Sequence, residues 1–105
     1  MTIKAAAQQT SGVNAAMAYG TDGPLAALGL VILADPLAVQ PVYAPAPVVR
    51  AEVLARYPKI RALLAPVFRT LDTTTLQTLN ARIALEGQDA RQVAADYLKA
   101  KGLVR

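Results

Sequence analysis

The chain of 105 residues contains no cysteine, no histidine and no tryptophan, and it has a single phenylalanine. The absence of cysteine excludes a disulfide framework, a thiolate zinc site and a thiol nucleophile. The absence of histidine removes the usual metal ligand and the usual general base near neutral pH. Because no acid–base pair or activated nucleophile takes their place, the sequence predicts a protein that is not an enzyme and that holds no metal and no cofactor.

Charge is also scarce in the first half of the chain. The only charged residues before position 48 are Lys4, Asp22 and Asp35. Over the whole chain 11 Lys and Arg exceed 7 Asp and Glu, which gives a net charge of +4 and a pI near 9.8. A basic pI is typical of nucleic-acid binders, but these cations are scattered and alternate with acids. Salt-dependent binding of nucleic acid through Arg50, Arg56, Lys59 and Arg61 is therefore the weakest binding hypothesis.

Long hydrophobic runs are missing too, although 54% of the residues are hydrophobic. The longest apolar stretch, residues 24–34, contains a glycine and has about half the length that spans a bilayer. Residues 1–12 lack the apolar segment of a secretory signal, so we expect no signal peptide in this chain.

The first half of the chain has the pattern of short buried strands separated by turns. Residues 13–19, 30–33 and 39–44 are predicted as three strands, the last at a sheet edge because Pro41 cannot donate a backbone hydrogen bond. Residues 20–24 form a turn, and Pro24 is predicted to open a short helical segment through Leu28.

The second half has helical periodicity. Helices are predicted over residues 48–57, 58–68, 73–86 and 90–101, with Asp72 and Asp89 as the N-caps of the last two. Strands followed by helices indicate an α/β fold. Since three short strands are too few for a sheet covered by four helices, the sequence predicts part of a larger domain.

Three residues are candidates for binding a ligand, namely Tyr19, Tyr43 and Asp22. Each of the two rings ends an extended segment beside small residues or proline, and an aromatic face attracts a quaternary ammonium ion. Core packing is the competing interpretation, since a cation site needs several rings. Asp22 is interpreted either as the organiser of an Asx turn or as part of a ligand-facing loop at the end of a strand.

Seven short runs give the chain a family resemblance through their order and spacing. They are 13–23 (VNAAMAYGTDG), 30–35 (LVILAD), 40–49 (QPVYAPAPVV), 52–58 (EVLARYP), 76–82 (LQTLNAR), 86–89 (EGQD) and 93–103 (VAADYLKAKGL). Together they resemble the C-terminal part of the substrate-binding proteins of ABC importers for glycine betaine, choline and related osmoprotectants.

The resemblance implies a fold and an architecture. It implies an α/β fold, a partial lobe of a type II periplasmic-binding-protein-like fold, with about three strands in the N-terminal half and four helices in the C-terminal half. Residues 1–105 would form one partial domain. In it, residues 1–23 end one lobe and cross over, and residues 24–105 complete the other lobe.

The resemblance also implies a site and partners. Tyr19 and Tyr43 would belong to an aromatic box around a trimethylammonium group, and Thr21 and Asp22 would line the cleft beside it. Pro24 stands where the family usually has a basic residue. The expected partners are a quaternary ammonium ligand, an ABC permease and the missing N-terminal lobe. The expected location is periplasmic or extracytoplasmic, on the membrane through the transporter.

A second interpretation keeps the chain as a small structural or oligomerisation module without ligand binding. Its apolar N-terminal half would then be buried in a homo-oligomer, because residues 13–18 and 30–33 would be an aggregation hazard if they were exposed in a monomer.

Overall fold

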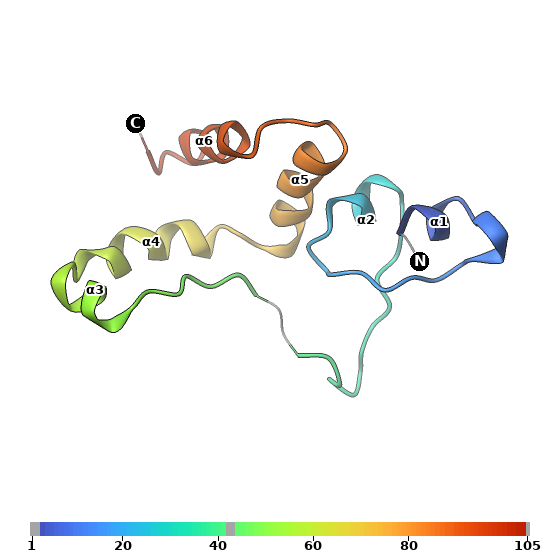
Figure 1. The fold of residues 1–105 in the computed structure, drawn as a ribbon, viewed down its shortest axis with the longest axis horizontal. Helices are drawn as coiled ribbons and strands as arrows, with labels where there is room; N and C mark the ends of the chain where they lie inside the picture. The colour runs from blue at the N-terminus through green and yellow to red at the C-terminus, as the bar shows by residue number, and fades with distance from the viewer. Residues whose placement is uncertain (1–2, 42–43, 105) are drawn as a thin grey trace.

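A computed structural model describes residues 3–41 and 44–104. Its elements are α1 (Ile3–Ala7), the short 3₁₀ helix η1 (Thr10–Gly12), α2 (Gly23–Ala27), α3 (Ala51–Arg56), α4 (Lys59–Arg69), α5 (Thr73–Ala84) and α6 (Ala90–Ala100). Figure 1 shows the three N-terminal elements at one end and α3 and α4 at the other, with α5 and α6 between and above them.

The predicted α/β fold class is wrong for the part of the chain that the structure describes, because residues 3–41 and 44–104 contain no strand. Residues 13–19 and 30–33 are irregular, as are the described residues of 39–44. Residues 42 and 43 lie outside the description. No backbone hydrogen bond joins these segments to one another within the described ranges. An apolar, β-branched run indicates a need for burial, but a strand also needs a hydrogen-bonded neighbour.

The four helices predicted in the second half are present, with shifts of a few residues at their ends. Local chemistry explains where the last two begin. The carboxylate of Asp72 accepts a hydrogen bond of 2.7 Å from the Thr75 amide, and that of Asp89 accepts one of 3.0 Å from the Gln92 amide. The short helix predicted from Pro24 is also present as α2.

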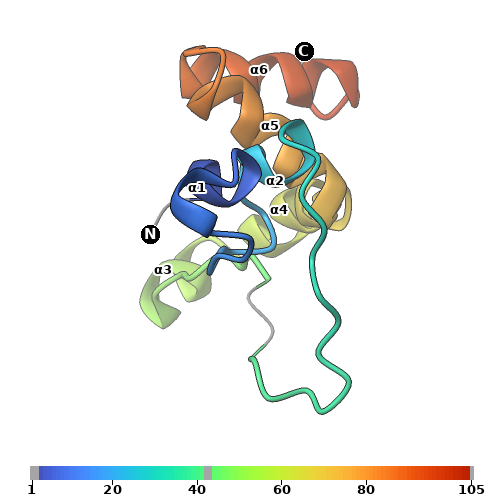
Figure 2. The same cartoon turned by 90° about the vertical axis from the view of Figure 1, so that its right-hand side faces the viewer.

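Two contacts between elements determine the arrangement of the N- and C-terminal parts. Helix α2 lies against α5, although some fifty residues separate them in the sequence (Figures 1 and 2). Helix α6 packs on α5, and the Tyr97 hydroxyl donates to the Thr70 carbonyl at 2.9 Å and lies 2.8 Å from the Thr70 hydroxyl. Helix α5 is therefore the element on which both ends of the chain converge.

The molecule is open rather than compact. Its radius of gyration is 17.1 Å, whereas a compact chain of this length has about 13 Å. Only Ala6, Leu25 and Val93 are buried hydrophobic residues in the described ranges. The segment after α2 leads away from the helices and exposes Val31, Leu33 and Leu37 by more than four-fifths of their area (Figure 1).

Candidate functional site

The predicted site residues Tyr19, Thr21 and Asp22 lie together in one tight turn that leads into α2. The Asp22 amide donates to the Tyr19 carbonyl at 2.9 Å, and the Tyr19 amide donates to the Asp22 carboxylate at 3.0 Å. This reciprocal pair closes the turn. Although α2 begins at the next residue, the Asp22 side chain does not cap it. Asp22 therefore organises the loop, but not as the predicted Asx turn, since its carboxylate accepts from the amide three residues earlier and not from the amide two residues later.

Two amide side chains of α5 hold the same turn from the other side. Gln77 Nε2 donates to the Gly20 carbonyl at 2.7 Å, and Asn80 Nδ2 donates to the Thr21 carbonyl at 2.7 Å. These bonds join residues 57 and 59 positions apart in the sequence. We call residues 19–22 the ligand loop, after the predicted site residues that it contains, and the two bonds the α5 clasp. The clasp gives the loop a fixed place on the longest helix of the described chain.

A close backbone approach accompanies the clasp. Gly23, the first residue of α2, is buried against α5, and a Cβ atom there would collide with the Ala81 backbone and lie 2.6 Å from the Asn80 carbonyl carbon. Only glycine permits this approach without displacement of one of the helices. The ligand loop and α2 are thus seated on α5 as one unit.

The predicted site residues differ in exposure. Tyr19 is 64% exposed, whereas Thr21 and Asp22 are half-buried. Tyr43, the second predicted cage residue, lies outside the described residues. The structure therefore brings three of the four predicted residues together, and the role of all four in ligand binding stays a prediction.

Neither Gln77 nor Asn80 was selected from the sequence. Amide side chains on a helix carry no charge pattern and no motif, so they resemble ordinary solvated residues. A weak indication was available, since positions 77, 80 and 81 lie on one helix face and Ala81 is small enough for another backbone to approach. Nothing local indicated which segment would approach it.

Tyr57 and Tyr97 each lie near a cation of this chain. The Arg56 guanidinium lies 5.5 Å from the centre of the Tyr57 ring, and Lys101 Nζ lies 5.7 Å from that of Tyr97. Packing explains Tyr97, whose hydroxyl is bonded to Thr70. Tyr57 is 53% exposed, so its ring lies at the surface.

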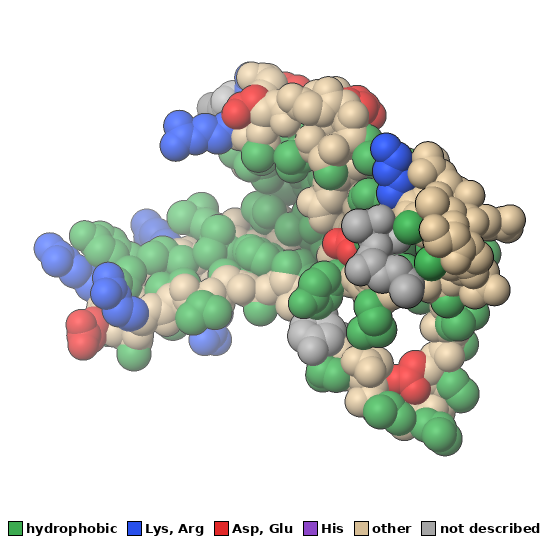
Figure 3. Space-filling model, turned by 45° about the vertical axis from the view of Figure 1, so that its right-hand side comes forward, with side chains coloured by type: hydrophobic (Ala, Val, Ile, Leu, Met, Phe, Trp, Pro, Cys, Tyr) green, Lys and Arg blue, Asp and Glu red, His purple; other side chains and the backbone are tan. Residues whose placement is uncertain are grey.

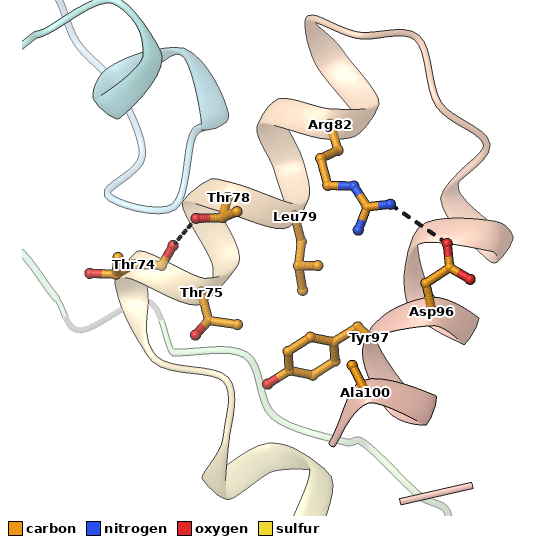
Figure 4. A pocket seen from close by; sticks show the side chains of 8 residues that line it. All are labelled: Thr74, Thr75, Thr78, Leu79, Arg82, Asp96, Tyr97 and Ala100. Atoms are coloured by element: carbon orange, nitrogen blue, oxygen red, sulfur yellow. Dashed lines mark hydrogen bonds and ion pairs between the residues drawn. The ribbon is translucent and has the colours of Figure 1, made fainter. Parts of the chain in front are cut away.

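An open groove of about 390 Å³ lies between α5 and α6 (Figure 4). It is lined by Thr74, Thr75, Thr78, Leu79, Arg82, Asp96, Tyr97 and Ala100. Its charged groups face each other, with Arg82 3.6 Å from Asp96, and the Thr78 hydroxyl donates to the Thr74 carbonyl. These polar groups bond to other groups of the same chain. We therefore interpret the groove as the line of contact between two packed helices.

A second concavity of about 560 Å³ lies at the junction of α3 and α4. It is lined by Arg56, Tyr57, Pro58, Lys59, Ile60 and Leu63. None of the described site residues lines it. Figure 3 shows Lys and Arg side chains gathered at this end of the molecule, and apolar side chains over much of the rest of the face.

Two carboxylates have lowered pKa values, and both are exposed. Backbone amides cause both shifts. The Gln40 amide, 2.8 Å away, is the main cause for the pKa of Asp35, and the Thr75 amide is the main cause for the pKa of Asp72. Neither shift belongs to the ligand loop. Each lowered pKa shows that the carboxylate accepts at least one hydrogen bond from a nearby backbone amide and so holds the local backbone.

Two further features are absent from the described residues, a metal site and a membrane-spanning helix. They contain no group of three or more His, Cys, Asp or Glu side chains arranged to hold a metal ion. In the same ranges, no helix has the length and apolar character needed to cross a membrane.

Comparisons with known proteins place the chain in a family. Residues 1–100 match the family described as the substrate binding domain of ABC-type glycine betaine transport systems. The chain is 72% identical over 102 residues to the glycine betaine-binding protein YehZ of Escherichia coli K12. It is 44% identical over 79 residues to a glycine-betaine-binding protein of Pseudomonas aeruginosa PAO1. These alignments cover 97% and 75% of this chain, and 33% and 25% of the relatives.

The solved structure of apo YehZ from Escherichia coli has the same arrangement in the matched part. The TM-score is 0.84 at 71% sequence identity, and the match covers 98% of this chain and 37% of that one. The chain thus spans about a third of the length of its E. coli relative. The resemblance seen in the seven sequence runs is confirmed: the chain belongs to the family of substrate-binding domains of ABC-type glycine betaine transport systems.

Proposed function

We propose that this chain supplies part of the binding site for a quaternary ammonium osmoprotectant, such as glycine betaine or choline, in the binding component of an ABC importer. The observation that carries the proposal is the exposed ring of Tyr19. This residue lies on a loop that is closed by Asp22 and held by the α5 clasp. The chain that carries the loop belongs to the glycine betaine-binding family. In this proposal Tyr19 and Tyr43 present ring faces to the cation, and Thr21 and Asp22 are their neighbours in the cleft.

The chemistry of capture is cation–π attraction. A quaternary ammonium group carries no hydrogen-bond donor, so a ring face within about 6 Å is a suitable partner for it. Each ring contributes about 0.5–2 kcal/mol, and more when water is excluded. Two rings therefore fall short of the roughly 8 kcal/mol that micromolar affinity requires. The remaining groups would come from the parts of the relatives that this chain does not cover.

The partners follow from this shortfall. We propose that the chain works with the rest of a binding domain, whose second lobe closes over the ligand and desolvates it. The loaded domain would then deliver the solute to an ABC permease on the extracytoplasmic side of a membrane. The family supports a transport role at this level.

A structural module without ligand binding is the second candidate function. One observation favours it, namely the exposure of the apolar segments after α2 and the small number of buried hydrophobic residues in the described chain. Such a module would use these segments to associate with another copy. It predicts no response of the ligand loop to quaternary ammonium compounds.

The first test is an NMR titration of the chain with glycine betaine and then choline. We expect saturable shifts of the amides of residues 19–23, with a Kd of about 1 mM or weaker, as two rings allow. Tyr19→Ala should remove the shifts, whereas Tyr57→Ala, which removes another exposed ring at a distant site, should not. An absence of shifts would favour the structural module.

A second test restores the missing part of the domain. The matched third of E. coli YehZ is replaced by this chain, and glycine betaine affinity is measured by calorimetry. Tyr19→Ala and Tyr43→Ala should each weaken binding by about 2- to 30-fold, the effect of losing one ring, and Tyr57→Ala should leave it unchanged. Equal affinities for all variants would contradict the cage assignment.

A further inference from the structure

We propose that Gln77 and Asn80 are positioning residues for ligand binding, because through the α5 clasp they fix the backbone that carries Tyr19. The consequence for affinity rests on the proposed function, whereas the consequence for the order of the loop does not. Both residues lie on α5, and neither is among the residues that the family resemblance assigns to the site.

The clasp acts on two consecutive peptide groups. Gln77 holds the Gly20 carbonyl and Asn80 holds the Thr21 carbonyl, each at 2.7 Å. Gly20 has no side chain, and the space where a Cβ would be is open, so no side-chain packing at this position helps to hold its backbone. Fixing both carbonyls sets the orientation of the peptide planes between Gly20 and Thr21 and between Thr21 and Asp22. The clasp therefore holds the backbone of the loop directly after the residue that follows Tyr19.

The two amides work together with the brace inside the loop. Asp22 ties the ends of the turn by accepting from the Tyr19 amide and donating its own amide to the Tyr19 carbonyl. This brace gives the turn its shape but no place in the molecule. The place comes from the packing of α2 on α5 and from the clasp, which holds Gly20 and Thr21 shortly before α2. The clasp therefore adds to the packing of α2 a direct hold on the backbone of the loop.

The donor group is what matters in each side chain, because a carbonyl oxygen accepts only from N–H or O–H. Gln77→Glu and Asn80→Asp keep the size and shape of the side chains but replace each NH₂ group by a carboxylate oxygen, which repels the carbonyl. Packing alone would tolerate both changes. Hence these near-isosteric variants separate positioning from simple occupancy of space.

The test uses the full chain and two measurements. The first is ¹⁵N relaxation of the amides of residues 20–22, compared with the amides of α5. We expect helix-like order in the unmodified chain and loss of that order, confined to the loop, in Gln77→Glu and Asn80→Asp. Gln8→Glu, the same change at an exposed position outside the clasp, is the control and should leave the loop ordered. The Gln77 variant, which changes an exposed hydrogen bond, decides the outcome if the Asn80 variant does not fold.

The second measurement is the Kd for glycine betaine of the same variants. The loss of one hydrogen bond of this kind is expected to weaken binding by about 2- to 10-fold, and Gln8→Glu should match the unmodified chain. Unchanged loop order in both clasp variants would overturn the inference. If the unmodified chain has an ordered loop but shows no binding, the proposed function fails while the relaxation data still decide whether the clasp positions the loop.

Discussion

At the scale of single residues, a few backbone contacts do more for the site than the side chains that would touch ligand. Gly23 permits α2 to approach α5, and the carbonyls of Gly20 and Thr21 are the groups that α5 holds. The side chain of Asp22 is used inside the loop. The backbone that carries the Tyr19 ring is held by these neighbours.

Gly23→Ala is therefore expected to separate α2 from α5. The added methyl group would meet backbone atoms of Ala81 and Asn80, which cannot rotate away. Overpacking of this kind costs about 1–3 kcal/mol. The measurement is the free energy of unfolding by urea, together with NOEs between the two helices. Gly20→Ala is the matched control, because a Cβ there has open space. Equal stability of the two variants would contradict the close approach.

The sequence predicted part of this residue-scale picture. Thr21 and Asp22 were predicted to lie in a turn of residues 20–24, because Gly20 and Gly23 flank them, and an organising role was one of two interpretations of Asp22. Tyr19 was predicted as the end of a strand, whereas in the structure it lies in the turn with them. The clasp was not predictable, because hydrogen bonds between residues 57 and 59 positions apart leave no trace in local sequence. The close approach at Gly23 was missed for the same reason.

At the scale of the element, α5 depends on the charge of its N-cap. The Thr75 amide, then the Thr75 hydroxyl, and finally the positive charge of Lys101 lower the pKa of Asp72 in the folded chain. A carboxylate whose folded pKa is depressed stabilises the fold above its unfolded pKa, about 3.9. That stabilisation is lost as the pH falls through the folded pKa.

We therefore expect the chain to lose helix content by far-UV circular dichroism as the pH falls below about 4. Asp72→Asn should reduce this acid-dependent loss, since asparagine still caps but does not titrate. Asp35→Asn is the control: the pKa of Asp35 is also lowered, but its carboxylate organises a non-helical segment. An acid transition of the same size in all three chains would contradict the assignment to the α5 cap.

The success of the sequence at this scale also has a physical cause. Helices are built from local hydrogen bonds and local caps, so Asp72, Asp89 and the spacing of apolar residues were enough to predict four helices. Strands need a neighbour that lies elsewhere, and in the described residues no segment offers one to residues 13–19 or 30–33. Their apolar character was read correctly, but the conformation inferred from it was wrong.

At the scale of the whole molecule, the chain exposes far more surface than its mass requires. Its accessible area is 8436 Å², whereas a compact protein of 11.0 kDa exposes about 5600 Å². The excess of about 2800 Å² is larger than the roughly 1600 Å² buried in a standard protein interface. Exposed Val31, Ile32 and Leu33 contribute to it.

We expect the isolated chain to self-associate with increasing concentration, since contiguous apolar segments of this size are rarely left in water. Analytical ultracentrifugation should show a mass that rises with concentration. Val31→Lys with Leu33→Lys should restore the monomer. Gln40→Lys with Gln8→Lys adds the same charge without removing apolar surface and should not. A monomer at every concentration would show that the exposed segments do not drive association.

The distance along the chain between the ligand loop and its clasp has a consequence for how the sequence can vary. Docking α2 on α5 closes a long chain loop through residues 24–76, and the entropy of closing such a loop rises only with the logarithm of its length. Doubling the connection would cost about 0.6 kcal/mol. Insertions and deletions in the exposed stretch after α2 are therefore nearly neutral for the geometry of the ligand loop. By contrast, the loss of a single side-chain amide at position 77 or 80 is expected to change that geometry.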